Sequence, residues 1–116
     1  MTTKLITRSE KLQALRLNFI SQLPGMMEQL VVDATGGGEA SPDPQALARA
    51  QRQAHTLAGT AGTFGLMEIY RDARELEELF VSSLQAGRAP ESGLLRLRVE
   101  ALQAAVHRVL LPRKAL

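Results

Sequence analysis

The fold is decided by the stretch PQALARAQRQAHTLAGTAGTFG, residues 44–65, whose apolar residues recur at helical spacing. A helix turns by about 100° per residue, so positions three and four apart share one face. The apolar stripe formed in this way consists of Leu47, Ala50, Ala54, Leu57 and Ala61. Asp43 and Pro44 suit the N-cap and the first turn of a helix, and GTFG at 62–65 interrupts it. We therefore predict a helix from residue 44 to about residue 62.

Similar apolar stripes lie on both sides of this helix. The first follows Ser9, a candidate N-cap, and consists of Leu12, Leu15, Phe19 and Leu23. Pro24 suits the start of a second, short helix, which ends before the Gly- and Pro-rich segment 36–44. After the GTFG turn, a helix is predicted from about Met67 to Gly87, a typical C-terminal stop.

The last helix is predicted to begin at Ser92, another candidate N-cap, and to end at Pro112. No strand-like alternation competes with these helical patterns. We therefore predict an all-α protein, an antiparallel four-helix bundle with a short additional helix. Residues 1–116 are predicted to form a single domain whose core bundle spans about 9–111.

The composition excludes several classes of protein. Hydrophobic residues make up 45% of the chain but aromatic residues only 3%, which suits a core of packed aliphatic helices. With no cysteine and only His55 and His107, we expect neither a disulfide nor a metal site, and no cofactor. No apolar run approaches the ~20 residues of a membrane span, and the first residues lack a secretion signal. These absences predict a cytoplasmic protein with no membrane partner.

The chemistry is concentrated around His55, which lies at the margin of the apolar stripe of the 44–62 helix. Gly59 and Gly62 lie beside it toward the C-terminal end, although each glycine within a helix costs roughly 1 kcal/mol relative to alanine. Two glycines there clear space next to one imidazole. Small residues also permit close helix–helix contact, so this pattern alone leaves both interpretations open.

Glu77 gives the histidine a candidate partner. A hairpin with its tip near 64–65 runs His55 antiparallel to the region 74–77, and Glu77 lies at the core margin of its own helix. The two positions differ along the axis by about 4.5 Å, which long side chains can bridge. A carboxylate that accepts a hydrogen bond from one ring nitrogen fixes the tautomer and leaves the other nitrogen free as a nucleophile.

The run AHTLAGTAGTFG, residues 54–65, resembles the phosphorylation motif of histidine-containing phosphotransfer (HPt) domains. The likeness is closest to the phosphotransfer domain of chemotaxis histidine kinases, and Leu76-Glu77 matches the Leu-Glu of the following helix. This resemblance implies a two-component phosphorelay in which His55 takes a phosphoryl group from a kinase or a receiver aspartate and passes it to a receiver domain. It also implies that Glu77 orients the ring and that Gly59 keeps the approach open.

One position departs from the family pattern. The family commonly has a lysine three residues after the histidine, near the phosphoryl oxygens, and here that residue is Ala58. Arg52 and Arg74 are candidates to supply positive charge instead, since one lies a turn before His55 and the other on the following helix. The expected site residues are therefore His55 and Glu77 for the chemistry, with Gly59, Gly62, Arg52, Ala58 and Arg74 for binding.

Two alternatives use the same sequence differently. The main one is an HPt-like docking module that binds a receiver domain or a sensor or hybrid histidine kinase without phosphotransfer, which the substitution at Ala58 favours and the intact His55 opposes. The other is a helical nucleic-acid binder. The net charge is only +2 and the C-terminal arginines lack interleaved aromatics, so we expect no nucleic acid as a partner. No nucleotide-binding motif is visible, so the chain is predicted to be a phosphoryl carrier and not an enzyme.

Overall fold

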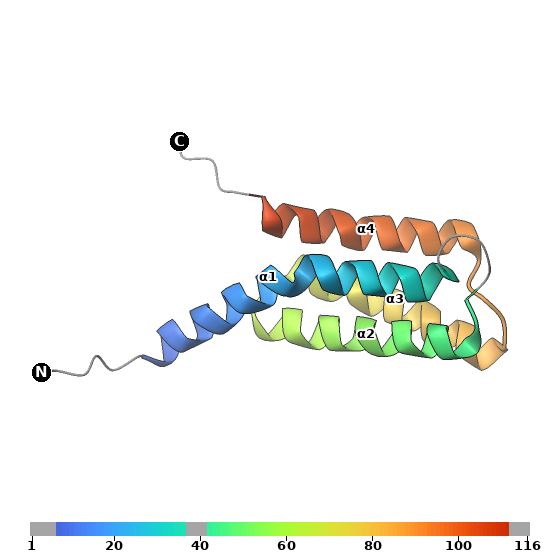
Figure 1. Cartoon of the computed structure of the whole chain (residues 1–116), viewed down its shortest axis with the longest axis horizontal. Coiled ribbons are helices and arrows are strands. Elements are labelled where there is room, and N and C mark those ends of the chain that lie inside the picture. The colour runs from blue at the N-terminus through green and yellow to red at the C-terminus, as the bar shows by residue number, and fades with distance from the viewer. Residues whose placement is uncertain (1–6, 37–41, 112–116) are drawn as a thin grey trace, which may run out of the picture.

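The computed structural model describes residues 7–36 and 42–111, which form four helices and, within these ranges, no strand. Along the chain they are α1 (Arg8–Thr35), α2 (Pro44–Thr63), α3 (Met67–Ala86) and α4 (Ser92–Leu110). Figure 1 shows them packed lengthwise as a bundle. The prediction of an all-α four-helix bundle is confirmed.

The turns on either side of α2 and α3 follow the predicted signals. The Asp43 side chain caps α2 by accepting a hydrogen bond from the backbone N–H of Ala46 at 2.7 Å, and Pro44 occupies the first turn. Gly65 and Gly87 both have positive φ values, 73° and 69°, which an L residue with a side chain rarely adopts. Gly65 makes the tight turn into α3 and Gly87 ends that helix, so both glycines set the geometry of the α2–α3 hairpin.

Two predicted N-caps are wrong by one or two residues. Helix α1 is capped by Thr7 and not by Ser9, because the Thr7 hydroxyl accepts a hydrogen bond from the backbone N–H of Glu10 at 3.0 Å. Helix α4 is capped by Glu91, whose carboxylate accepts from two backbone N–H groups of the first turn at 2.9 and 2.7 Å. Ser92 is the first residue of that helix. In both places two nearby polar side chains compete, and the one that reaches the free N–H groups becomes the cap.

The predicted short helix starting at Pro24 does not exist as a separate element. Pro24 lies inside α1, which continues through it. A proline in a helix removes one hydrogen bond and its ring crowds the carbonyl four residues earlier, here that of Ile20. The expected result is a bend, and Figure 1 shows the first half of α1 running at an angle to the second. The helix continues because Leu23 and Met27 are buried on the same face before and after the proline.

The core is built almost entirely from aliphatic side chains. Its largest fully buried members are Phe80, Leu23, Leu30, Leu57, Ile69, Leu76 and Leu102. Helices α2 and α3 share the most extensive contact of the bundle, with Ala50, Ala54 and Ala73 completely buried. Small side chains let two helix backbones approach closely, so the residues at the margins of this contact are brought within hydrogen-bonding reach.

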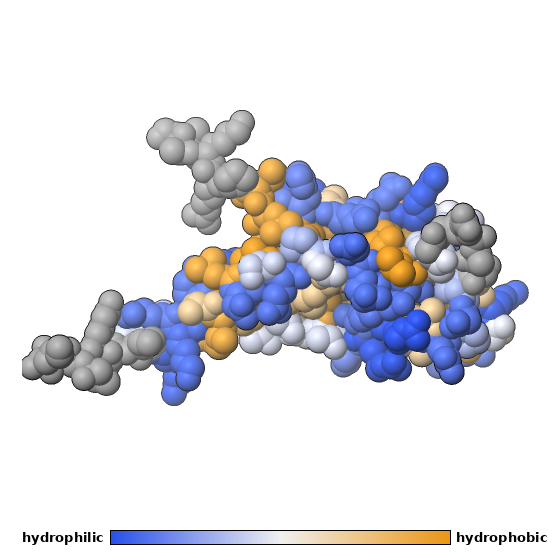
Figure 2. All heavy atoms as spheres, in the orientation of Figure 1, coloured by the Kyte–Doolittle hydropathy of each residue, from blue (hydrophilic) through white to orange (hydrophobic). Residues whose placement is uncertain are grey.

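One end of the molecule carries exposed apolar side chains. Figure 2 shows them over the first half of α1 and the C-terminal end of α4. They include Leu12, Leu15, Leu17, Leu110 and Leu111. Among the helices described, none is both long enough and apolar enough to cross a membrane.

Candidate functional site

His55 lies in the middle of α2, with 72% of its side chain exposed. The helix that carries it packs against the core through the neighbouring Ala54 and Leu57, which are both buried. The histidine thus projects from a fixed helix and not from a loop. A partner protein can reach the ring without any rearrangement of the bundle.

Glu77 of α3 holds the ring from one side. His55 Nδ1 and Glu77 Oε2 are 2.7 Å apart, and only 14% of the Glu77 side chain is exposed. A carboxylate can only accept a hydrogen bond, so Nδ1 carries the hydrogen and donates it. In the neutral ring Nε2 then keeps its lone pair, and no residue of 7–36 or 42–111 forms a hydrogen bond with it. The two side chains meet as expected from their positions along the hairpin.

A third residue of this group was not anticipated from the sequence. Gln51 Nε2 donates a hydrogen bond of 3.2 Å to Glu77 Oε2, the same oxygen that accepts from His55. Gln51 lies one helical turn before His55 on α2, and residues four apart share a helix face. The spacing of four residues between Gln51 and His55 was the signal in the sequence that could have indicated this contact.

The two glycines beyond His55 have different roles. A Cβ atom added at Gly59 would meet nothing within 4 Å, so Gly59 leaves open surface one turn from the ring. A Cβ at Gly62 would lie 3.2 Å from the Tyr70 ring of α3. Gly62 therefore makes room for the packed Tyr70 side chain, and its predicted part in binding stays a prediction.

Arg74 lies close to the histidine, on the rim of an open hollow. The hollow is lined by His55, Arg74, Glu77, Glu78, Val81 and Ser82. The Arg74 guanidinium also lies 5.9 Å from the centre of the Tyr70 ring, within the range of a cation–π contact. Positive charge is thus present beside His55 on the α3 side.

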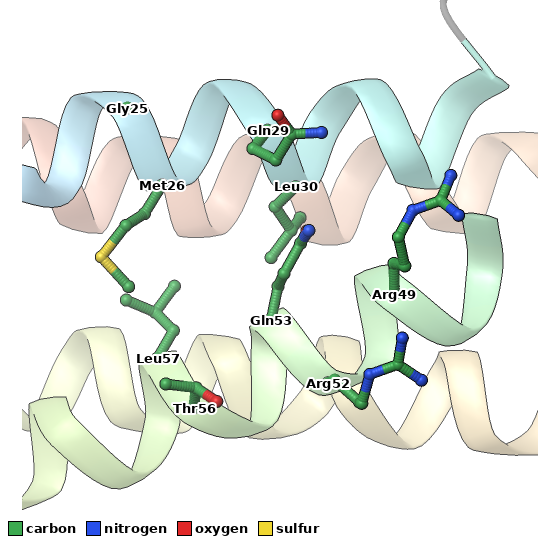
Figure 3. Close-up of a pocket in the computed structure, with 9 residues that line it drawn as sticks. All are labelled: Gly25, Met26, Gln29, Leu30, Arg49, Arg52, Gln53, Thr56 and Leu57. Carbon is green, nitrogen blue, oxygen red and sulfur yellow. The ribbon is translucent and has the colours of Figure 1, made fainter. Parts of the chain in front are cut away.

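Arg52 and Ala58 are not part of this surface. Arg52 lines a separate groove between α1 and α2, together with Arg49 and the apolar side chains of Met26 and Leu57, as Figure 3 shows. Ala58 is only 2% exposed and belongs to the core. The side chain of Ala58 is therefore buried, and its role among the binding residues stays a prediction.

A buried carboxylate lies on the opposite side of α2. Asp33 of α1 is 5% exposed and accepts hydrogen bonds from Gln53 at 2.8 Å, Gln29 at 3.2 Å and Arg49 at 3.4 Å. Burial alone would raise the pKa of Asp33, but these hydrogen bonds and the Arg49 charge outweigh it and lower the pKa below its usual value. The Gln53 Oε1 atom is buried without a partner in the described residues. This cluster ties α1 to α2, and sequence patterns gave no sign of it.

The site contains no arrangement suited to a metal ion. Within 7–36 and 42–111, no three His, Asp or Glu side chains come together as ligands. The chemistry open to the group is that of one exposed imidazole whose Nδ1 is paired with a carboxylate. That imidazole can act as a nucleophile toward a group brought by another molecule.

The structure thus has an exposed histidine on the second helix of a four-helix bundle, paired with a carboxylate from the third. In the comparison with protein families, the model of the Hpt domain matches residues 10–109. The chain belongs to the Hpt domain family and hence to two-component phosphotransfer signalling. Members of this family carry phosphoryl groups and are not kinases. No curated protein and no solved structure matches the sequence.

Proposed function

We propose that His55 accepts a phosphoryl group on Nε2 from a histidine kinase or from a receiver aspartate, and passes it to the aspartate of a receiver domain. The observation that carries this proposal is the 2.7 Å contact between His55 Nδ1 and Glu77 Oε2 beneath a ring that is 72% exposed. That contact leaves Nε2 as the nucleophile and directs it toward solvent, where a partner arrives.

The transfer forms one N–P bond and breaks one P–O bond. The Nε2 lone pair attacks phosphorus, and the P–O bond to the donor breaks with its electrons going to the leaving oxygen. The ring gains positive charge as the N–P bond forms, and the Glu77 carboxylate stabilises it while holding the Nδ1 hydrogen. Transfer to a receiver aspartate is the reverse step, in which a carboxylate oxygen attacks phosphorus and the N–P electrons return to Nε2.

The surroundings of His55 support this role. Gly59 leaves the approach to the ring open, and Arg74 places positive charge on the rim of the adjoining hollow. We propose that Arg74 interacts with the phosphoryl oxygens in place of the lysine that this chain lacks. Arg52 faces the α1–α2 groove and is not required for that purpose.

The proposed phosphotransfer on His55 also leads to a proposal for the domain, its location and its partners. We propose that residues 1–116 act as one domain, working in the cytoplasm with a receiver domain and a sensor or hybrid kinase as partners. A docking module without phosphotransfer is the alternative. The intact pair of His55 and Glu77 argues against it, because docking alone requires no aligned nucleophile.

The test is to incubate the purified chain with candidate phosphorylated receivers or kinase cores and to measure intact mass and acid lability. We expect one acid-labile phosphoryl group on the wild type and none on His55→Gln. His107→Gln is the matched control, because His107 is an exposed histidine on α4, and it should be labelled like the wild type. Labelling that survives His55→Gln contradicts the proposal.

A further inference from the structure

We propose that Gln51 is a positioning residue for the phosphotransfer reaction, acting by holding the Glu77 carboxylate against His55. This inference rests on the proposed function of His55. It assigns to an uncharged side chain the task of keeping Nε2 available for attack.

The geometry gives Glu77 two attachments to the same helix. Its Oε2 atom accepts from His55 Nδ1 at 2.7 Å and from Gln51 Nε2 at 3.2 Å. The two donors lie one turn apart on α2, and the acceptor comes from α3. A carboxylate on a glutamate side chain has several rotatable bonds, and a single hydrogen bond to an exposed ring leaves both groups free to turn. The second donor removes that freedom, since it fixes the oxygen relative to the helix that carries the ring.

The chemistry of the amide also suits this task. Its NH₂ group must face Glu77, because the amide oxygen in that place would repel the carboxylate. A lysine or arginine at position 51 would neutralise the carboxylate and weaken its attraction for the ring charge that develops during transfer. Glutamine donates a hydrogen bond and leaves the negative charge of Glu77 in place.

Because Gln51 and His55 share one oxygen of Glu77, Gln51 could instead compete with His55 for it. Positioning and competition predict opposite effects of removing Gln51. If Gln51 positions Glu77, its removal loosens the contact between Glu77 and His55. If Gln51 only competes with His55 for Oε2, its removal strengthens that contact. The fraction of the ring that carries its hydrogen on Nδ1 therefore falls in the first case and rises in the second.

The experiment compares Gln51→Met, which keeps the length of the side chain but removes the donor, with the wild type. Ring ¹⁵N chemical shifts give the tautomer, and a time course with phosphorylated receiver gives the rate. We expect the Nδ1–H tautomer to decrease and transfer to slow by about 5-fold, the scale of one net hydrogen bond. Gln45→Met is the matched control, an exposed glutamine in the first turn of the same helix, and should change neither quantity.

The two measurements separate this inference from the proposed function. A wild type that is phosphorylated, with an unchanged or increased Nδ1–H tautomer in Gln51→Met, overturns the role of Gln51 and leaves the function of His55 intact. A wild type that accepts no phosphoryl group from any receiver or kinase core overturns the proposed function. The ring signals of the unphosphorylated protein still decide whether Gln51 fixes the tautomer.

Discussion

Helix α2 is flanked by two carboxylates, and they are held in comparable ways. Asp33 approaches it from α1 and Glu77 from α3, and each accepts a hydrogen bond from a glutamine of α2, Gln53 at 2.8 Å and Gln51 at 3.2 Å. They differ in their remaining partners. Asp33 is enclosed by a second amide and a guanidinium. Glu77 instead bonds to His55, a ring that reaches solvent.

This difference shows what converts a structural carboxylate into a candidate functional one. The partners of Asp33 are two amides and a guanidinium, none of which is a nucleophile, so the charge of Asp33 serves to join two helices. The histidine bonded to Glu77 has a second ring nitrogen, which can form a new covalent bond. Burial and hydrogen bonding are common to both groups, and what separates them is a reactive atom left open at the surface.

The largest effect is expected at Gly59, on the open side of α2. Gly59→Leu should slow phosphotransfer from a receiver by about 100-fold or more, because a displacement of the reacting groups by 1 Å can have that effect. The free energy of unfolding should rise by about 0.8 kcal/mol through helix propensity, since a Cβ added at Gly59 meets nothing within 4 Å. A phosphotransfer time course and urea unfolding measure the two quantities. Gly59→Ala should stabilise similarly and slow transfer less, and equal rates for Leu and wild type would refute the clearance argument.

At Asp33, on the side of α2 that faces α1, we expect a loss of stability with no change in phosphotransfer. Asp33→Ala leaves the amides of Gln53 and Gln29 and the guanidinium of Arg49 without their acceptor, which should reduce the free energy of unfolding by about 2 kcal/mol. Phosphotransfer by the folded fraction should be unchanged. Urea unfolding followed by circular dichroism measures the first quantity.

The contribution of the Asp33 charge to the free energy of unfolding depends on pH with a definite sign. The folded-state pKa of Asp33 is lowered, so its stabilising effect is fully present above the unfolded value and is lost as the pH falls through the folded value. The difference in stability between the wild type and Asp33→Asn should therefore shrink below about pH 4, near the ordinary pKa of an aspartate. A difference that grows in acid would contradict the assignment.

A smaller effect on the rate is expected at Glu77. Glu77→Ala should slow phosphorylation by about 10-fold to 100-fold, on the scale of losing an outer partner of a functional histidine, without abolishing it. The Glu77→Ala variant should lose less free energy of unfolding than the Asp33→Ala variant, because His55 remains solvated when Glu77 is removed. Parallel time courses and unfolding curves of the two alanine variants test this contrast. A rate equal to that of the wild type would make Glu77 as purely structural as Asp33.

The smallest effect is expected at Asp72, away from both clusters. Burial and the neighbouring charges of Glu75 and Glu68 raise its pKa, so its ionised form is disfavoured in the folded state. Asp72→Asn should therefore stabilise the protein slightly at neutral pH, and this gain should disappear as the pH falls below the unfolded pKa. Thermal unfolding at neutral and acidic pH measures it, and destabilisation at pH 7 would be the contrary result.

Much of the α2–α3 hairpin could be predicted because its geometry follows from the spacing of residues along the sequence. The Asp43 cap, the 62–65 turn and the Gly87 stop fix the two helices, and an antiparallel pair of known length brings His55 opposite Glu77. The position of Ala58 was predictable too, since it falls in line with Leu47 on the helix and hence on the core face.

Other features depend on contacts between segments and could not be predicted from residue spacing. Pro24 suits both a helix start and a bend, and only the packing of Leu23 and Met27 against the other helices selects the bend. Gly62 is explained by Tyr70 across the hairpin. The hydrogen bond from Gln51 requires side-chain rotamers that no pattern specifies.

The open position of His55 also has a thermodynamic consequence for a phosphoryl group carried there. Because 72% of the side chain is exposed, a phosphoryl group carried on Nε2, as we propose, would stay largely hydrated. The free energy of hydrolysis of the N–P bond then stays close to that of phosphohistidine in water. On the proposed function, the direction of net flow then depends on the ratio of phosphorylated to free partner proteins.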